Sequence, residues 1–297
     1  MLTLRQLRYF EAAARSGHFG QAADECAVSQ PALSMQIKEL EEELGAALFE
    51  RRPGEVVLTP LGHEIAARAS SILLAVNDLG AIAKHRTRVL AGPLSLGIIP
   101  TLAPYILPRL LVHLQKEYPQ LRLELREAQT KAMLAELVRG ELDLVMAAIP
   151  NGMSDLDEEH LFDDRFLLAT PSEDPRKTRV DPETLDPAQL ILLEEGHCLR
   201  DQALSFCAPE RGLMKTGLGA TSLSTVMQMV ANGYGATFIP EIAVETETRG
   251  RNLSLSRFTA PEPSRKIGLV WRKTSPRRRD FEAFGAAVRE ALKNRRK

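Results

Sequence analysis

The first sixty residues place their apolar positions at the spacing of short helices. Apolar side chains recur every three or four positions over residues 4–16, which predicts an amphipathic helix that Gly17 ends. A second, shorter helix is predicted over residues 20–27. A third begins after Ser29, a natural N-cap, with Pro31 in its first turn. Two short helices joined by a tight turn, the second opening with small polar groups, are typical of a helix-turn-helix.

The third helix is predicted to have one buried and one outward face. Its buried stripe consists of Leu33, Ile37, Leu40 and Leu44. Its outward side chains are Gln30, Ser34, Gln36 and Lys38. Residues 48–62 then predict a β-ribbon wing, in which Arg51 and Arg52 are placed to reach phosphates. A three-helix bundle with no ligand remains an open alternative, because residues 1–90 contain ten Lys/Arg and eleven Asp/Glu and their charge does not decide it.

A longer apolar-periodic segment follows from His63 to about Val89. One face of this predicted helix carries Ile65, Ala69, Ile72, Val76, Leu79 and Ala83. The preceding sixty residues are too few to cover this apolar face. We therefore expect a second copy of the chain to cover it. Ala91, Gly92 and Pro93 then predict a hinge.

Beyond the hinge the pattern changes to alternating strands and helices. Strand, helix, strand, helix and strand are predicted in turn up to residue 149, a βαβαβ start that implies a parallel, doubly wound sheet with right-handed crossovers. Further strands are predicted near Leu167 and Leu192, and residues 267–272 predict a strand that returns to the sheet. The basic runs at 277–279 and 295–297 are interpreted as solvated charge or as charge that complements a helix dipole.

Composition limits the class of protein. The 297 residues are 44% hydrophobic and 26% charged, as in ordinary soluble proteins. Three cysteines cannot form a disulfide framework, and the chain shows neither a signal peptide nor an apolar run long enough for a bilayer. We therefore expect a cytoplasmic protein with no membrane partner. A net charge of −1 argues weakly against nucleic-acid binding, so any role on DNA must rest on the helix-turn-helix motif.

Two of the three cysteines lie in one stretch, LEEGHCLRDQALSFCAP at residues 193–209. Cys198 is predicted to open a short helix, where free backbone N–H groups and the neighbours His197 and Arg200 would favour its thiolate. An intact helix would hold the Cα atoms of Cys198 and Cys207 about 13 Å apart. A disulfide needs about 4.4 to 6.8 Å. Either the two cysteines never bond, or bonding them unravels the helix and acts as a switch.

Other interpretations of these residues stay open. Free cysteines are often buried as small hydrophobic side chains without chemistry. A zinc site is disfavoured, because no second Cys/His pair stands at ligand spacing, and no cofactor or catalytic constellation is evident. Ligand sites in such sheets lie beyond the carboxyl ends of the strands, here at Thr101, Thr130 and the turn at 196–198. Thr101 and Thr130 are equally well placed to cap helices.

These motifs carry a resemblance to a known family. Residues 19–51, FGQAADECAVSQPALSMQIKELEEELGAALFER, resemble the winged helix-turn-helix of LysR-type transcriptional regulators. The resemblance implies an α/β chain with a winged helix-turn-helix head at 1–60, a linker helix and hinge at 61–91, and a two-lobed, periplasmic-binding-protein-like effector domain at 92–297. IPT at 99–101, EAQT at 127–130, GHCLRDQALSFC and PSRKIGLVWR are similar to the hydrogen-peroxide sensors of that family.

The resemblance also implies roles for individual residues. Cys198 resembles a peroxidatic cysteine and Cys207 the resolving one. The polar pocket around them would comprise Thr101, Thr130, His197, Arg200, Asp201 and Arg265. The DNA-binding residues would be Ser29, Gln30, Pro31, Ser34, Gln36, Arg51 and Arg52. Promoter DNA, hydrogen peroxide, a homotetramer and RNA polymerase are the implied partners, and Cys26 receives no role.

Three functions compete on this basis. The leading hypothesis is a transcription factor that senses peroxide through sulfenic acid at Cys198 and a disulfide to Cys207. A metabolite-sensing regulator of the same architecture would leave both cysteines inert. A thiol peroxidase, with a head that serves only dimerisation, would turn over with a reductant, but it leaves the polar opening of the third helix unexplained.

Overall fold

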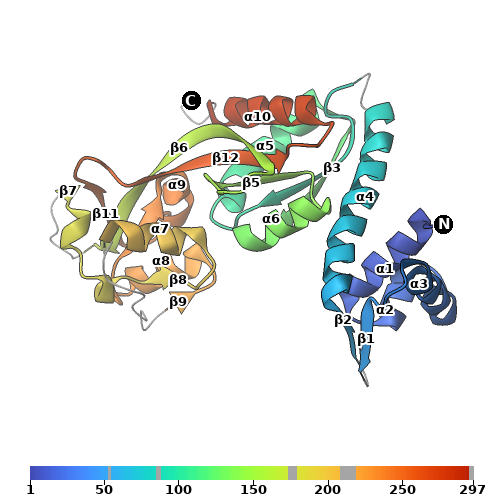
Figure 1. Ribbon diagram of the computed structural model, residues 1–297. Coiled ribbons are helices and arrows are strands. Elements are labelled where there is room, and N and C mark those ends of the chain that lie inside the picture. The colour runs from blue at the N-terminus through green and yellow to red at the C-terminus, as the bar shows by residue number, and fades with distance from the viewer. Residues whose placement is uncertain (53–54, 85–87, 173–178, 208–218, 294–297) are drawn as a thin grey trace. The chain divides into compact units, whose positions relative to one another are not determined.

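A computed structural model describes residues 1–52, 55–84, 88–172, 179–207 and 219–293, with the side chains of 51, 52, 55 and 81–84 left aside (Figure 1). The chain divides into two compact units, Met1–Arg86 and Thr87–Lys297.

The first unit opens with three helices, α1 (Leu4–Ser16), α2 (Phe19–Glu25) and α3 (Gln30–Leu44). α1 begins with a capping box, in which the Thr3 hydroxyl accepts from Gln6 N and the Gln6 side chain accepts from Thr3 N. It ends at Gly17, whose φ of 65° is the left-handed conformation that glycine adopts at no steric cost. Ser29 caps α3 by accepting from Ala32 N, so the predicted start of the third helix is confirmed.

A two-stranded wing follows α3, with β1 (Phe49–Arg52) antiparallel to β2 (Glu55–Leu58). The Phe49 ring packs edge-on against Phe10 in the core of the unit, with 5.3 Å between centroids. Glu41 of α3 accepts backbone N–H groups from Leu48 and Phe49, at 2.7 and 3.2 Å. One carboxylate of the acidic run at the end of the third helix therefore fixes the wing to that helix.

The long helix, α4 (Pro60–Lys84), differs from its predicted bounds. It begins three residues early because the Thr59 hydroxyl accepts from Gly62 N and Pro60 suits a first turn. Ala69 is buried in the core of the head. Farther along the helix, Ile72 and Leu79 are 46% and 66% exposed. Ile72, Val76 and Leu79 of the predicted apolar stripe are therefore uncovered in the single chain.

The first lobe of the second unit is built as the sequence predicts. β3 (Gly92–Ile98) lies parallel to both β4 (Leu121–Glu127) and β5 (Leu144–Ile149). The connecting helices are α5 (Ala103–Glu117) and α6 (Thr130–Arg139). They bury apolar faces in one core together with the last helix, α10 (Arg278–Lys293).

Beyond the third strand the all-parallel prediction is wrong. β12 (Ser264–Arg272) inserts antiparallel between β5 and β6 (Leu156–Pro171). Residues 156–165 of β6 run along β12, with a register shift at Leu161, and the remaining six pair with β10 (Thr237–Pro240) and β11 (Leu253–Phe258). β6 therefore runs through both lobes, as Figure 1 shows.

The second lobe has its own core. Its helices are α7 (Cys198–Cys207), α8 (Leu223–Ala231) and α9 (Val244–Glu247), with short 3-10 turns at Pro182–Thr184, Pro187–Gln189 and Glu241–Ala243. Short strands complete it: β7 (Arg179–Val180) parallel to β11, and β8 (Leu192–Leu193) parallel to β9 (Gly219–Ala220). Separate clusters of buried side chains fill the two lobes, which confirms the two-lobed domain.

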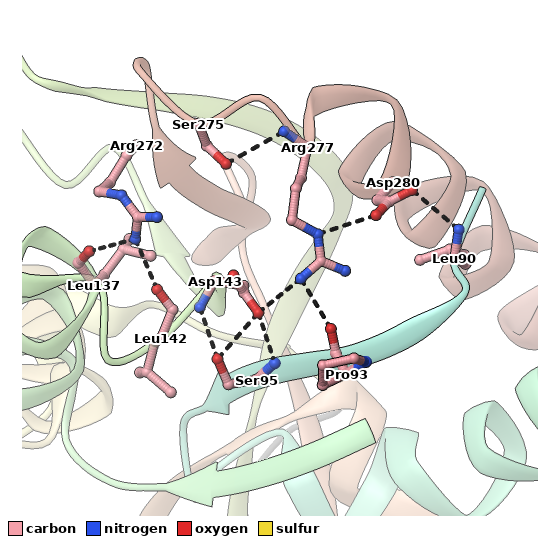
Figure 2. A network of polar contacts seen from close by, with 10 residues as sticks. All are labelled: Leu90, Pro93, Ser95, Leu137, Leu142, Asp143, Arg272, Ser275, Arg277 and Asp280. Carbon is pink, nitrogen blue, oxygen red and sulfur yellow. Dashed lines mark hydrogen bonds and ion pairs between the residues drawn. The ribbon is translucent and has the colours of Figure 1, made fainter. Parts of the chain in front are cut away.

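A buried ionic network holds the start of this domain (Figure 2). Arg277 donates through Nε to Asp280 and through Nη1 to Asp143, both at 3.0 Å, and to the Pro93 carbonyl at 2.9 Å. Asp280 accepts from Leu90 N at 3.0 Å. The interpretation of the run at 277–279 as solvated charge is thus wrong for Arg277, which anchors the chain leaving the hinge. The run at 295–297 lies outside the described residues.

This network generates a stability prediction. Asp280→Asn keeps the size of the side chain but removes the charge facing Arg277, and we expect unfolding to become easier by about 2 kcal/mol. Glu282→Gln in the same helix is the matched control, because its pair with Arg278 is exposed and should add nothing measurable. Urea unfolding followed by circular dichroism measures both variants. Equal stability of the two would show that the buried network does not hold the domain.

Candidate functional site

The loop before α7 brings the second lobe onto the first. The Gln129 side chain, at the start of α6, donates to the Glu195 carbonyl at 3.1 Å. Gly196 has a φ of 90°, and a Cβ atom there would lie 2.3 Å from Gln129 Oε1. Only glycine suits both the left-handed backbone and this close approach. The turn therefore delivers Cys198, the first residue of α7, to the junction of the lobes.

The two cysteines occupy different cores. Cys198 is half-buried and packs against the core of the first lobe, whereas Cys207 is buried in the core of the second. Both are free thiols, and they stand at opposite ends of the unbroken helix α7, as the sequence predicts. At the rise of an α-helix, nine residues separate their Cα atoms by about 13 Å. In this conformation no disulfide can join them.

Arg265, on β12, is the buried cation at the junction of the lobes. It is 2% exposed, and its guanidinium donates to Asp164 Oδ2 from Nε at 3.0 Å and from Nη2 at 2.8 Å. The same group donates to the Thr101 hydroxyl at 2.8 Å and to the Thr101 carbonyl at 3.2 Å. The structure thus brings together Thr101 and Arg265, which are 164 positions apart.

The two threonines do not cap helices. The N-cap of α5 is Leu102 and that of α6 is Gln129, and neither makes a side-chain capping hydrogen bond. Thr101 instead accepts from Arg265. The Thr130 hydroxyl faces the thiol of Cys198 and lowers its pKa, yet within the described residues its buried oxygen has no hydrogen-bond partner of regular geometry. A buried, unsatisfied hydroxyl beside a thiol is suited to a small polar ligand.

Burial dominates the ionisation of both thiols. Desolvation raises the pKa of Cys198 above the ordinary 9.0, and the charge of Asp201 adds to it. Arg265, the Thr130 hydroxyl and the Leu199 N–H lower the pKa, but together they do not outweigh burial. The predicted help from the start of the helix is present in the Leu199 N–H, but burial raises the pKa by more than the favourable groups lower it. Burial alone raises the pKa of Cys207 to about 12.

The residues next to Cys198 in the chain are not the groups that lower its pKa. Arg200 is buried and donates from Nη1 to the Leu193 carbonyl at 3.2 Å. His197 is also buried, and Asp201 is exposed. The cation that lowers the pKa of Cys198 is Arg265, which comes from a distant strand.

Two residues at the junction had no signal in the sequence. Asp164, from β6, fixes Arg265. Tyr105, from α5, packs against both cores and donates through its hydroxyl to Glu247 Oε1 at 2.8 Å. Burial and this hydrogen bond raise the pKa of Tyr105. Arg251 pairs with the same carboxylate at 2.5 Å, so a Tyr105–Glu247–Arg251 group ties α5 to the second lobe.

The head presents the start of α3 to solvent. Ser29, Gln30 and Pro31 are exposed there, and Ser34 is half-buried. Gln36 is also half-buried and donates to Glu39 Oε2 at 2.7 Å, so it is less outward than predicted. Arg51 and Arg52 lie on β1, but their side chains are outside the described residues. Met35, which the sequence analysis did not single out, is 57% exposed on the same helix.

Metal-ligand clusters and membrane-spanning helices are both absent from the described part of the chain. Among those residues no group of three or more His, Cys, Asp or Glu side chains is arranged to hold a metal ion. None of the helices described is long and apolar enough to cross a membrane.

Family models match nearly the whole chain. Residues 4–63 match the bacterial regulatory helix-turn-helix of the LysR family, and residues 87–293 match the LysR substrate-binding domain.

Individual proteins match over the same length. A probable hydrogen peroxide-inducible genes activator from Streptomyces viridosporus is 42% identical over 98% of this chain and 95% of its own. The structure of a full-length OxyR variant from Pseudomonas aeruginosa superposes with a TM-score of 0.78 at 36% identity, covering 97% of this chain and 98% of that one. A Corynebacterium glutamicum OxyR mutant with bound H2O2 gives a TM-score of 0.67 at 37% identity, covering 98% and 93%.

The electrostatics of the thiol generate a second prediction. Thiolate is the nucleophile, and the pKa of Cys198 is raised, so alkylation of Cys198 by iodoacetamide should accelerate as pH rises from 7 to 9. Arg265→Ala removes the cation that lowers this pKa, and we expect alkylation at pH 7.5 to slow about tenfold. Arg165→Ala is the control, because Arg165 is largely exposed and pairs with Glu262. Mass spectrometry of the Cys198 peptide follows the reaction, and identical rates in the two variants would contradict the role of Arg265.

Proposed function

The chain belongs to the LysR family of bacterial helix-turn-helix regulators, and we propose that it controls transcription in response to hydrogen peroxide through oxidation of Cys198. The family models and the full-length similarity to OxyR and to a peroxide-inducible activator support the coarser part of this proposal. The observation that carries the finer part is the placement of Cys198 and Cys207 in separate cores at the two ends of one helix.

The proposed chemistry starts at the junction of the lobes. The minor thiolate fraction of Cys198 attacks one peroxide oxygen, so an S–O bond forms, the O–O bond breaks, and hydroxide leaves. Sulfur is oxidised and the peroxide is reduced. The positive charge of Arg265, which already lowers the pKa of Cys198, would stabilise the leaving oxygen, and the Thr130 hydroxyl would hydrogen-bond the peroxide. The hydroxide takes up the proton that the Cys198 thiol released on ionising, so the products of the step are the Cys198 sulfenic acid and water.

The second step would join the cysteines. The Cys207 sulfur displaces the hydroxyl of the Cys198 sulfenic acid, giving a disulfide and releasing water. Since the sulfurs stand at opposite ends of α7, this bond requires the helix to unwind and Cys198 to leave the core of the first lobe. Leu199 and Phe206, which pack in the second core, would be displaced as well. The lost packing amounts to a few kcal/mol at about 25 cal/mol per Å², within reach of disulfide formation.

The response is proposed to act on promoter DNA. In the helix-turn-helix mode α3 enters the major groove with Ser29, Gln30, Pro31, Ser34 and Gln36, while the wing carries Arg51 and Arg52 to the phosphates. Symmetric binding places two such helices about 34 Å apart. The exposed stripe of Ile72, Val76 and Leu79 on α4 supports dimerisation through this helix. A homotetramer acting with RNA polymerase in the cytoplasm completes the proposal.

The redox switch is tested on α7. Peroxide should abolish the hydrogen-exchange protection of residues 198–207, because the helix cannot persist in the disulfide form. Cys198→Ser should remove the response completely. Cys207→Ser should allow sulfenic acid at Cys198, detected with dimedone, without loss of protection. Cys26→Ser is the control and should respond like the unsubstituted protein.

The same experiment separates the competing functions. Protection that is identical with and without peroxide would leave the cysteines inert, as in a metabolite-sensing regulator. A thiol peroxidase would instead consume peroxide continuously when a recycling thiol is present, and much faster than the protection of α7 is lost.

The DNA-binding assignment predicts different losses for base-reading and phosphate-contacting residues. Ser34→Ala and Gln36→Ala should weaken binding to a specific site by about tenfold and leave random DNA nearly unaffected. Arg51→Ala should weaken both DNAs alike and reduce the salt dependence. Fluorescence anisotropy on both DNAs measures this, with Lys116→Ala in the second unit as the control. Equal losses on the two DNAs for all three substitutions would remove the base-reading role of α3.

A further inference from the structure

We propose that Asp164 is a positioning residue for the thiol reaction: its buried carboxylate holds the Arg265 guanidinium in the one orientation that serves Cys198. The inference rests on the proposed function, in which Arg265 assists the attack of Cys198 on peroxide. Asp164 would touch neither the thiol nor the peroxide and would act through Arg265 alone.

The hydrogen bonds of Arg265 leave its guanidinium no freedom to rotate. Of its five N–H groups, four are engaged: two donate to Asp164 Oδ2, one to the Thr101 hydroxyl and one to the Thr101 carbonyl. Within the described residues the remaining N–H, on Nη1, has no hydrogen-bond partner. Asp164 and Thr101 thus determine where this one free donor points.

Asp164 is itself held in place. It is 3% exposed, and while Oδ2 binds Arg265, Oδ1 accepts from Ile242 N at 3.1 Å. In the register of the sheet Asp164 of β6 lies directly opposite Arg265 of β12. The Phe166 ring closes another side of the guanidinium, with its centroid 5.8 Å from Arg265 Cζ. A carboxylate with both oxygens occupied can fix the plane of its partner, whereas a mobile surface carboxylate cannot.

The position of this pair in the fold links it to both lobes. Asp164 is two residues before the point where β6 stops pairing with β12 and starts pairing with β10 and β11. Ile242, whose N–H it accepts, follows β10 in the chain and packs in the core of the first lobe. The orientation of Arg265 is therefore set where the lobes join, which is also where Cys198 lies.

A positioning role and a purely electrostatic role predict opposite effects of Asp164→Asn. If only net charge at the thiol mattered, removing a carboxylate would make the site more positive and the oxidation of Cys198 faster. If Asp164 orients Arg265, the amide provides one acceptor in place of a carboxylate, the guanidinium turns away, and oxidation slows. The sign of the rate change decides between the two.

The experiment measures sulfenic acid formation at Cys198 in the full-length Cys207→Ser protein, which stops after the first step. Dimedone trapping and mass spectrometry give the second-order rate constant for hydrogen peroxide from pH 6 to 9. We expect Asp164→Asn to lower the rate constant at pH 7.5 about tenfold and to move the pH profile to higher pH. Asp163→Asn, in the adjacent exposed position paired with His160, should leave both unchanged. An unchanged or faster reaction of Asp164→Asn would overturn the proposal.

If the Asp164→Asn protein does not fold, the same substitution is measured in a second background. In the Arg265→Gln background, adding Asp164→Asn replaces the ion pair with two neutral amides of similar size. Because Asp164 acts only through Arg265, this addition should change the rate constant less than twofold, and a tenfold further loss would show a separate role. If peroxide does not oxidise Cys198 at all, the proposed function fails. Iodoacetamide then replaces peroxide, and slower alkylation in Asp164→Asn still supports the positioning role.

Discussion

The buried ion pair between Arg265 and Asp164 is the interaction on which the geometry around Cys198 depends. Taking two charges out of water costs several kcal/mol each, so such a pair persists only where further hydrogen bonds satisfy both partners. Thr101 supplies them for the arginine and Ile242 N–H for the carboxylate. Loss of either partner would leave an uncompensated charge at the junction of the lobes, and the geometry around Cys198 would change with it.

Burial and charge act on Cys198 in opposite directions. Packing against the first core raises its pKa, while Arg265 and the Thr130 hydroxyl lower it. The outcome is a thiol whose pKa is raised overall, with Arg265 as the cation that lowers it. A thiol reacts in proportion to its thiolate fraction, so a displacement of Arg265 away from Cys198 would lower its reactivity.

The parts of this structure that the sequence predicts are those set by local physics. The Ser29 cap, the end of α1 at Gly17 and the span of α7 follow from side chains within a few positions of one another. The first half of β6 was not predicted, because LDEEHLFDDR is polar at most positions. Its few apolar residues do not alternate regularly with polar ones, as they do in a typical half-buried strand. Asp164 was missed for a related reason: its partner is 101 positions away, and only the sheet register brings them together.

The same limitation applies to the ionisation of Cys198, for which the sequence indicated the contribution of the helix start but neither the cation nor the effect of burial. His197 and Arg200 adjoin Cys198 in the chain, but backbone adjacency does not determine which side chains share a pocket. The guanidinium of Arg200 instead contacts the Leu193 carbonyl. Desolvation is also a property of the whole packing arrangement and cannot be estimated from neighbours in sequence.

Two of the ionic groups of the second unit have different mechanical roles. Arg277, Asp143 and Asp280 lock the chain after the hinge to the first lobe, so residues 90–93 can only move together with that lobe. Arg265 and Asp164, in contrast, lie where β6 passes from one lobe to the other, beside the helix that a disulfide would have to unwind. A covalent change at Cys198 therefore begins at the junction between lobes and encounters a first lobe that is already rigidly joined to the segment leaving the hinge. Any reorientation of that lobe would be passed to this segment, because Arg277 is joined to the buried Asp280 and to the partly buried Asp143 and donates to the Pro93 carbonyl.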